Sequence, residues 1–399
     1  MPQAVLPRFS ARELADLADP YPTYARLRAA GALCRGGPAQ WFVTRYAEVA
    51  ALLRDPRLGA AQPPEFRAFS LGDGPAASFL SRVLGRRDPP DHTRIRKLMT
   101  HTFSPGQVRA LEQRVGALVD ELFAKTSVPG RFDPVTDIAF PLPLMVICDL
   151  IGIPRADEHL VRPRANALAR AFGGVLSADD RAVADEAVDW MRGYIHDMLR
   201  ARRPAAGGDV LARLLVAAED PVAPTTVDDI VDNVIFLFFA GFETTMNLIS
   251  GGCALLSQRP ADFARLRADR SLVGPAVEEF LRYDAPFQMA LRTTLEPIEV
   301  DGHRIGRGRV IVLLLGSANH DERQFHEPER LDLARYPNPH LSFGGGIHHC
   351  FGSALARLEA RLVLDGLVDR CARLEPAGEI ERRAEFRSYV HVPLVGHAR

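Results

Sequence analysis

Helical spacing of apolar residues covers most of the chain. Apolar side chains that recur every three to four positions predict helices that bury one face. This pattern covers residues 20–30, 47–53, 91–103, 108–125, 134–150, 157–171, 179–201, 209–217, 260–269, 276–284 and 353–374. Residues 62–85 instead mix proline, glycine, serine and phenylalanine without a period, and they predict a long loop with one short helix.

One further helical segment, residues 226–257, is unusually long. Asp228, Asp229 and Asp232 lie near its start, where the helix dipole favours negative charge. Its middle, residues 234–240, is apolar on all sides. A helix that is apolar all round belongs in the centre of a large domain, so we expect this one to be buried.

The pattern changes after Tyr283. Residues 41–44 and alternating stretches within 291–315, with a turn at Asp301-Gly302, predict short strands. Residues 337–352 are glycine-rich and irregular, and the end of the chain predicts further short strands and turns. Since no repeat or linker separates these parts, we predict one domain over residues 1–399, mainly α with small β-sheets.

Composition excludes several classes of protein. Of the 399 residues, 47% are hydrophobic and 25% charged, and the net charge of −1 gives no overall bias toward nucleic acid or a membrane surface. The longest apolar runs, 233–242 and 310–318, are shorter than the roughly 20 residues that span a bilayer. Five widely spaced cysteines without a CxxC argue against a disulfide framework. We expect a cytoplasmic protein that binds neither membranes nor nucleic acid.

The most informative segment is FGGGIHHCFG, residues 343–352. Three successive glycines cost backbone entropy unless they let the chain pass close to a flat or bulky group. Cys350 precedes the helical run 353–374, whose first N–H groups would stabilise a thiolate and lower its pKa. An isolated cysteine is more often a buried apolar residue. A zinc site that includes His348 and His349 lacks a second ligand pair.

The pattern Phe-Gly-x-Gly-x-His-x-Cys-x-Gly of this segment resembles the haem-binding signature of the cytochrome P450 family at every defining position. The resemblance implies the family's fold, with a long central helix that crosses haem b (iron protoporphyrin IX). Cys350 would ligate the iron, and a thiolate ligand favours O–O cleavage. His348 would bind a haem propionate, and His349 holds a variable position without a role. The cofactor-binding residues implied here are Phe343, Gly344, Gly346, His348, Cys350 and Gly352.

A second motif, Ala-Gly-Phe-Glu-Thr-Thr at 240–245, lies inside the long apolar helix. An acid and a hydroxyl group are costly there unless they are satisfied, and a solvated face is the alternative. The motif resembles the family's oxygen-activation motif. By that resemblance Glu243 would help relay protons, the Thr244 hydroxyl would take part in oxygen activation, and Ala240 and Gly241 would lie against the haem.

Two more pairs follow the helical period. Glu279 and Arg282 are three residues apart; the alternative to a motif is a surface ion pair of little value. They resemble the family's ExxR motif, which would be buried and structural, with Arg330 as a third member. His92 and Arg96 share a helix face that could be solvated. The resemblance implies instead that His92, Arg96, Arg292 and His348 bind the haem propionates.

The substrate pocket is a weaker inference, because each candidate could equally be core packing. The mostly apolar set predicts a hydrophobic small molecule, in a natural-product tailoring step on a polyketide, terpenoid or steroid. The candidates are Leu80, Val83, Leu84, Phe236, Phe239, Phe287, Gln288, Met289 and Phe386.

Electrons must come from another protein, since no flavin or iron–sulfur domain fits in the chain. The resemblance implies ferredoxin and ferredoxin reductase, and we expect a monomer. Arg94, Lys97, Arg109 and Arg357 could form a basic docking patch or be ordinary solvated side chains. The predicted activity is O2-dependent hydroxylation or epoxidation. A haem-thiolate sensor without turnover, or a peroxide-driven or non-oxygenating member, is the alternative, and the acid–threonine pair argues against both.

Overall fold

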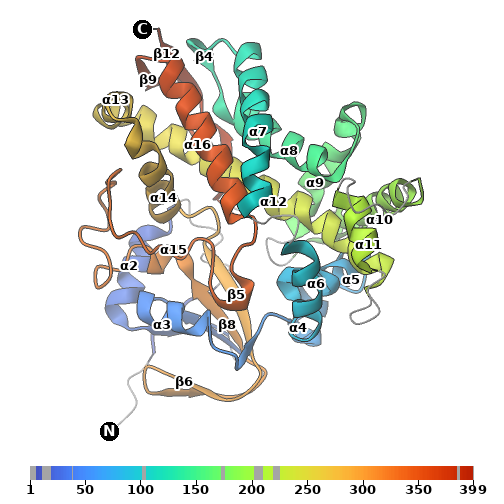
Figure 1. Cartoon of the computed structure of the whole chain (residues 1–399). Coiled ribbons are helices and arrows are strands. Elements are labelled where there is room, and N and C mark those ends of the chain that lie inside the picture. The colour runs from blue at the N-terminus through green and yellow to red at the C-terminus, as the bar shows by residue number, and fades with distance from the viewer. Residues whose placement is uncertain are drawn as a thin grey trace.

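The computed structural model describes residues 6–10, 19–37, 39–100, 105–171, 176–201, 210–218, 225–383 and 387–398. Helices make up most of this part of the chain, and short strands form small sheets (Figure 1). The predicted mainly α architecture is confirmed. The helices are α2 (Tyr21–Ala30), α3 (Tyr46–Leu52), α4 (Pro64–Leu71), α5 (Pro75–Arg82), α6 (Asp91–Thr100), α7 (Pro105–Lys125), α8 (Pro141–Ile151), α9 (Glu158–Ala171), α10 (Ala178–Arg200), α11 (Val210–Ala218), α12 (Val227–Ser257), α13 (Pro260–Ala268), α14 (Val273–Tyr283), α15 (Leu315–Ala318) and α16 (Ser353–Arg370).

The largest sheet brings together distant parts of the chain, in the order β1-β2-β8-β5-β3. Strands β2 and β8 are parallel, with Phe42 opposite Val312, and the other pairs are antiparallel. Odd and even positions of β8 enter different apolar clusters, so both faces of the sheet are covered. The strands are β1 (Leu33–Arg35), β2 (Gln40–Val43), β3 (Leu58–Gly59), β5 (Met289–Thr294) and β8 (Val310–Leu314), with smaller sheets of β4 (Gly130–Phe132), β9 (Arg373–Pro376) and β12 (Leu394–His397), of β6 (Ile298–Val300) and β7 (His303–Ile305), and of β10 (Glu381–Arg382) and β11 (Tyr389–His391).

Several predicted boundaries were wrong, and proline explains most of them. Residues 62–85 hold two helices, α4 and α5, because Pro64 and Pro75 occupy first turns, where a missing N–H costs nothing. The predicted helix 134–150 is divided near Phe140 into a wide turn and α8, which begins at Pro141. The predicted helix 353–374 ends at Arg370, and strand β9 follows.

Helix α12 is the central element of the fold. The Thr226 hydroxyl accepts a hydrogen bond from the Asp229 backbone N–H at 3.1 Å, which caps the first turn. Helices α8, α9, α10 and α16 pack around it (Figure 1). By length and composition α12 could cross a membrane, but 76% of its most apolar window is buried inside the protein. It is therefore a core helix, as its pattern predicted.

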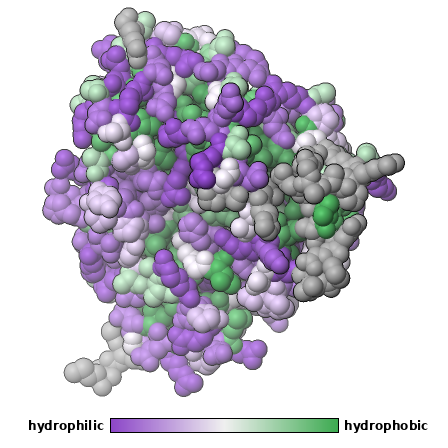
Figure 2. Space-filling model, viewed as in Figure 1, coloured by the Kyte–Doolittle hydropathy of each residue, from purple (hydrophilic) through white to green (hydrophobic). Residues whose placement is uncertain are grey.

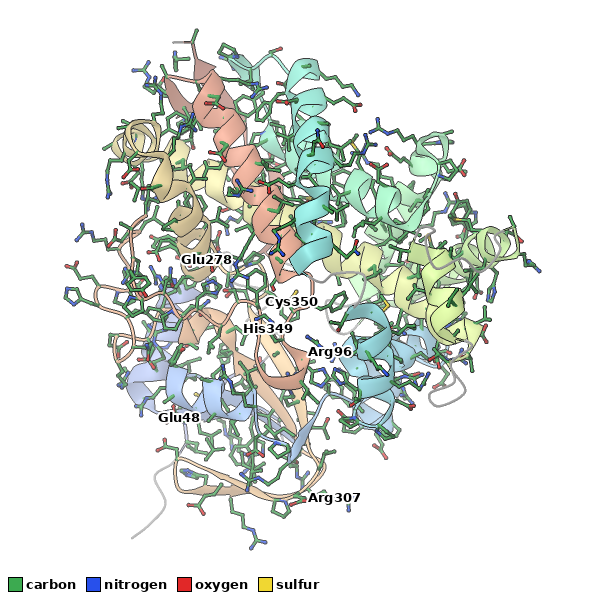
Figure 3. The ribbon with its side chains drawn as sticks, in the orientation of Figure 1. Glu48, Arg96, Glu278, Arg307, His349 and Cys350 are labelled. Carbon is green, nitrogen blue, oxygen red and sulfur yellow. The ribbon has the colours of Figure 1, made fainter. Side chains whose placement is uncertain are left out.

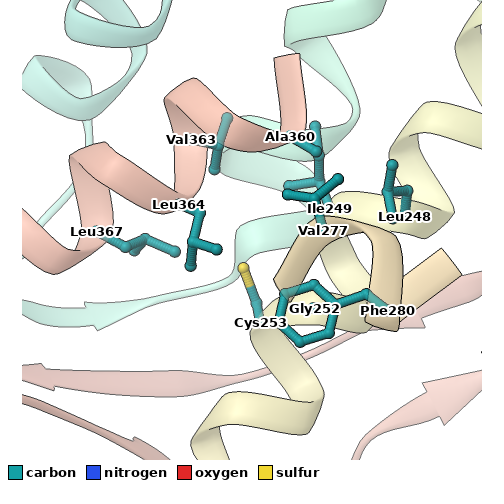
Figure 4. A pocket seen from close by; sticks show the side chains of 10 residues that line it. All are labelled: Leu248, Ile249, Gly252, Cys253, Val277, Phe280, Ala360, Val363, Leu364 and Leu367. Carbon is teal, nitrogen blue, oxygen red and sulfur yellow. The ribbon is translucent and has the colours of Figure 1, made fainter. Parts of the chain in front are cut away.

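The outer surface contrasts with this core. The face shown in Figure 2 is mostly hydrophilic, with smaller hydrophobic areas between the polar side chains. Inside, an apolar pocket lies between α12, α14 and α16 (Figure 4). None of the residues predicted to bind substrate lines this pocket, so it is a gap in core packing. Its lining is Leu248, Ile249, Gly252, Cys253, Val277, Phe280, Ala360, Val363, Leu364 and Leu367.

Glu279 and Arg282 on α14 form a fully buried ion pair. Nε and Nη2 of Arg282 each donate to one carboxylate oxygen of Glu279 at 2.8 Å, and both side chains are 0% exposed. Nη1 of Arg282 donates to the carbonyl groups of Asn319 and Pro328. A buried pair is tolerated when its remaining hydrogen-bonding capacity is filled in this way. The pair therefore fastens α14 to the segment that follows α15.

The third member of this network is Arg335, and the prediction of Arg330 was wrong. Nε of Arg335 lies 3.1 Å from both oxygens of Glu279, and its side chain is 10% exposed. The Arg330 side chain is 67% exposed and pairs with a neighbouring exposed carboxylate. Only its backbone carbonyl accepts a bond from Arg282. A turn closed by the Arg335 N–H and the Asp332 carbonyl brings the later arginine to the pair.

Replacing these two arginines separately tests the assignment. Arg335→Ala removes charged hydrogen bonds from a buried carboxylate and should lower the free energy of unfolding by about 1.5–3 kcal/mol. Arg330→Ala removes an exposed pair and should change it by less than about 0.5 kcal/mol. Urea unfolding of the protein measures both values, and equal losses would contradict the assignment.

Candidate active site

Residues 343–352 form a tight loop that ends at α16. The Cys350 N–H donates to the Phe343 carbonyl at 2.9 Å, which closes the loop. Gly344 and Gly346 have φ angles of +69° and +63°, a left-handed backbone that glycine adopts at little cost. Figure 3 shows Cys350 near the middle of the molecule, between the start of α16 and Arg96 on α6.

Gly346 and Gly352 of this loop lie next to different groups. A Cβ atom at Gly346 would lie 2.6 Å from the Leu53 carbonyl oxygen, so its close approach is to the chain itself. Gly352 has an ordinary φ of −81°, and among the described atoms a Cβ there would meet only the Cys350 sulfur, at 3.9 Å. The chain's own packing therefore requires glycine at 346, while it leaves space beside Gly352.

Cys350 differs from the other cysteines. All five are free thiols, and four are buried while Cys350 is exposed. Enough protein still surrounds its sulfur that desolvation raises the thiol pKa. The Gly352 and Ser353 N–H groups and the charges of Arg96 and Arg357 oppose this rise. The predicted lowering of the pKa was wrong because burial outweighs the helix start, although the groups that would stabilise a thiolate are in place.

Arg357 on α16 is held beside this loop. Its guanidinium carbon lies 4.4 Å from the Phe343 ring centroid, and Nε donates to Glu278 at 2.6 Å. Burial raises the pKa of Glu278, but hydrogen bonds from His340 and Arg357 outweigh it and bring this pKa to about 2. Phe343 is thus fixed by a cation–π contact next to Cys350, close to its predicted place.

Only some residues of the predicted basic docking patch are exposed in the structure. The Arg94 side chain is 18% exposed and lies 3.1 Å from both Asp91 and Asp229, so it is directed to α12. Lys97 and Arg109 remain exposed. Arg94 therefore does not belong to the patch, because its charge is neutralised within the protein.

The four residues predicted to bind propionates come together from α6, β5 and the cysteine loop. The rings of His92 and His348 lie 4.3 Å apart, and Nε2 of each is buried without a hydrogen-bond partner. Burial, with the charge of Arg292, lowers the pKa of His348 to about 3; burial and Arg96 lower that of His92. Burial also lowers the pKa of Arg292 to about 10, only partly offset by Asp88.

This cluster has the properties of an anion site. Buried guanidinium groups and unsatisfied ring nitrogens are costly unless an anion accepts their hydrogen bonds. The two carboxylates of a haem would do so, and an accessible thiol with space beside Gly352 lies on the same loop as His348. The residues present therefore fit a haem that is ligated by Cys350.

Helix α12 presents one accessible stripe. Between residues 230 and 256, the described residues that are not buried are Phe236, Ala240, Gly241 and Thr244, which lie on one face at helical spacing. The Thr244 hydroxyl donates to the Ala240 carbonyl at 2.8 Å. Thr245 is only 3% exposed. The structure thus separates the two threonines and leaves Thr244 as the accessible one.

Glu243 is turned toward the end of the chain. Its carboxylate accepts hydrogen bonds from the buried Ser388 hydroxyl and from Nη2 of Arg383, the latter at 3.1 Å. Asn247, one turn further along α12, donates to the Ser388 hydroxyl. Glu243 is 3% exposed, whereas the Arg383 side chain is 42% exposed. The buried acid is therefore satisfied, and its partner Arg383 reaches solvent. No local sequence signal pointed to Arg383 and Ser388, which are 140 and 145 positions away.

The predicted pocket residues before α6 and on α12 differ in burial. Leu80, Val83 and Leu84 are at most 4% exposed and belong to the main core. Phe236 packs against the same core with part of its surface accessible. The side chain of Phe239 lies outside the described part of the structure. Phe236 is thus the residue of this group that an incoming molecule can reach.

The candidates at the start of β5 also differ. Phe287 is 38% exposed, while Gln288 is 8% exposed and donates to the Tyr21 hydroxyl at 3.2 Å. Met289 packs against the cluster on one face of the large sheet. Phe386 lies outside the described residues. The amide of Gln288 is thus engaged in structure, and Phe287 offers apolar surface.

A multi-ligand metal site has no support in the described residues. No group of three or more histidine, cysteine, aspartate or glutamate side chains there could hold a metal ion. A zinc centre at His348, His349 and Cys350 is therefore not supported.

Comparison with known proteins points to the same family as the sequence motifs. A family model described as Cytochrome P450 matches residues 169–391. Cytochrome P450 monooxygenase PikC of Streptomyces venezuelae is 37% identical over 364 residues, 90% of this chain and 85% of that protein. The 6-deoxyerythronolide B hydroxylase of Saccharopolyspora erythraea is 34% identical, with 88% of each chain covered. The structure of P450BioI with acyl carrier protein ligated to hexadec-9Z-enoic acid has a TM-score of 0.89 at 31% identity, covering 97% of this chain and 100% of that one. The fold implied by the resemblance is confirmed.

Proposed function

This chain belongs to the cytochrome P450 family and is a mono-oxygenase, and we propose that it hydroxylates or epoxidises a hydrophobic small molecule in a natural-product pathway, with haem b as its haem-iron cofactor. The observation that carries this proposal is the accessible Thr244 beside the buried, satisfied Glu243 on α12. A protein that only bound or sensed a ligand would have no need of a hydroxyl and an acid placed together in a dry core.

Cys350 is the proposed iron ligand in this assignment. When bound, the haem supplies oxygen binding and activation, which a thiolate ligand promotes. The Gly352 and Ser353 N–H groups with Arg96 and Arg357 would stabilise the thiolate charge. His92, Arg96, Arg292 and His348 would hold the propionates, and Ala240, Gly241 and Gly344 would lie against the ring. Glu279 and Arg282 keep a structural role.

Glu243 and Thr244 would deliver protons to the reacting oxygen. Arg383 reaches solvent and contacts Glu243, so protons can approach the buried carboxylate from the surface. Glu243 must release Ser388 or Arg383 to turn toward Thr244, whose hydroxyl can then donate outward instead of to Ala240. General acid catalysis requires this continuity, because an apolar pocket offers few other donors.

The substrate proposed is an apolar molecule of polyketide, terpenoid or steroid type. Phe236 and Phe287 give accessible aromatic surface, and a relative of 34% identity is named as a hydroxylase of 6-deoxyerythronolide B. The pocket would also be bordered, beneath this accessible surface, by the more buried residues Leu80, Val83, Leu84, Gln288 and Met289.

Binding spectra test this class. A macrolactone or steroid should displace water from the iron and shift the Soret band, whereas a small polar alcohol should not. Phe236→Ala should weaken binding of the best apolar ligand about tenfold, since it removes a buried aromatic contact. An unchanged affinity would remove Phe236 from the pocket.

Electrons would come from ferredoxin and its reductase, in the cytoplasm. Lys97 and Arg109 give positive charge on the exposed surface, which suits an acidic partner. The five free cysteines agree with a reducing compartment. We propose that the chain acts as a single domain and a monomer.

The iron ligand has a direct spectroscopic test. The reduced protein with carbon monoxide should show the red-shifted Soret band of thiolate ligation. Cys350→Ser should abolish this band, because a hydroxyl group does not replace the thiolate, while Cys371→Ser, at a buried thiol in the core, should retain it. Persistence of the band in Cys350→Ser would overturn the ligand assignment.

The threonine pair offers a matched test of proton delivery. Thr244→Ala should divert electrons from product to hydrogen peroxide, because the accessible hydroxyl is lost. Thr245→Ala changes a buried neighbour and should keep coupling near the wild-type value. The ratio of product to NAD(P)H consumed measures the effect, and full coupling in Thr244→Ala would rule out the role.

A further inference from the structure

We propose that Asn247 and Ser388 are positioning residues that hold Oε1 of Glu243, so that the proton relayed by this acid is carried on Oε2. The inference rests on the proposed function, since it requires Glu243 to deliver protons. Neither positioning residue belongs to the Ala-Gly-Phe-Glu-Thr-Thr motif. Asn247 lies one turn beyond Glu243 on α12, and Ser388 immediately precedes β11.

The end of the chain is fixed against one face of α12. Glu243, Asn247 and Gly251 are spaced four residues apart, so they lie on the same face of this helix. A Cβ atom at Gly251 would lie 3.2 Å from the Tyr389 ring, so glycine lets β11 approach closely there. The Tyr389 N–H donates to Oδ1 of Asn247 at 3.1 Å. Ser388, the residue before Tyr389, is 0% exposed and therefore has a defined position beside Glu243.

The Tyr389 N–H determines the direction of the next two hydrogen bonds. A backbone N–H can only donate, so the Asn247 atom that faces it must be the amide oxygen. The amide nitrogen of Asn247 then faces Ser388 and donates to its hydroxyl oxygen at 3.2 Å. The single proton of this hydroxyl group is left for Glu243, which accepts it on Oε1. Asn247 thereby makes Ser388 a donor to the acid.

Both donors to Glu243 contact the same carboxylate oxygen. Nη2 of Arg383 lies 3.1 Å from Oε1, the atom that also accepts from Ser388. Among the described residues, no donor contacts Oε2. An oxygen that accepts from two donors has no room for a proton of its own, so the neutral acid must carry its proton on Oε2.

The two donors lose different amounts when Glu243 turns toward Thr244. The Arg383 side chain is 42% exposed, so water can replace the carboxylate at little cost. Ser388 is fully buried, and a hydroxyl proton left there without an acceptor is expensive. Arg383 is therefore the contact that opens, while the hydrogen bond from Ser388 to Oε1 is retained as the pivot.

The proton transfers balance without any movement of electrons. The O–H bond at Oε2 of Glu243 breaks as the Thr244 oxygen gains this proton and passes its own proton to the reacting oxygen. Solvent then returns a proton to Oε2. Hydrogen peroxide already contains the two protons and two electrons that O2 must gain, so turnover driven by peroxide does not need this delivery.

Infrared spectra test the anchor without turnover. Glutamate labelled with a heavy carbon isotope at its carboxyl group separates its bands from those of aspartate, and Glu243→Gln assigns the Glu243 band. Ser388→Ala should shift this band, because one donor is lost. Asn247→Asp keeps the acceptor for the Tyr389 N–H but removes the donor, so the Ser388 hydroxyl should turn to it and the Glu243 band should shift as well. Ser250→Ala removes a buried hydroxyl group of α12 that has no partner among the described residues, and it should leave the band unchanged.

The infrared result decides the hydrogen-bond directions. An unshifted band in Ser388→Ala would overturn the anchor, and an unshifted band in Asn247→Asp would overturn the role of Asn247. These outcomes are distinct from failure of the proposed function, which full coupling in Thr244→Ala or absence of the thiolate band with carbon monoxide in wild type would show.

Turnover of the holoenzyme tests the positioning role. With O2, the ratio of product to NAD(P)H consumed should fall about tenfold in Ser388→Ala and in Asn247→Asp, and it should stay within about twofold of wild type in Ser250→Ala. With hydrogen peroxide, product formation should stay within about twofold of wild type in all three variants. Full coupling in Ser388→Ala, or an equal loss with O2 and with peroxide, would overturn the role. Arg383→Gln should lose less coupling than Ser388→Ala, and a larger loss would make Arg383 the anchor instead.

Discussion

The buried Glu279–Arg282 pair is the interaction on which the cysteine loop depends. Its guanidinium group holds the carbonyl of Asn319, and the Asn319 side chain in turn binds Ser342 and the Leu341 N–H. Leu341 accepts the first hydrogen bond of the cysteine loop. A charge pair without solvent is stable only while these partners remain in place. The position of Cys350, the proposed iron ligand, is therefore set by polar contacts that begin on a different helix.

Helix α12 combines two environments along one element. Its accessible stripe carries Thr244, while Glu243 faces the C-terminal strands and is held by Arg383 and Ser388. The same strands are anchored at Asp284, which accepts hydrogen bonds from Arg382 and Tyr389. The placement of the proposed proton-relay acid thus depends on the end of the chain, although its helix is defined by local sequence.

The sequence correctly predicted the elements that depend on the spacing of nearby residues. The long apolar run predicted α12, and the glycine–cysteine motif predicted the loop before α16. Both features depend on residues that are close together in the sequence. Arg335 could not be chosen over Arg330, because a turn of the backbone decides which side chain returns to the buried carboxylate. Arg383 was missed for a related reason: long-range folding brings it to Glu243, and it lies in no matched motif.

The charged groups of the site couple haem binding to the stability of the fold. Arg96 acts on both the Cys350 sulfur and His348, so one guanidinium group would serve a thiolate and a propionate together. Without these anions, burial disfavours the charge of Arg292, and Asp88 offsets this only in part. Binding of the haem therefore removes a cost already present in the protein. That benefit falls on α6, β5 and the cysteine loop at once, so haem binding should stabilise the folded arrangement of these three segments.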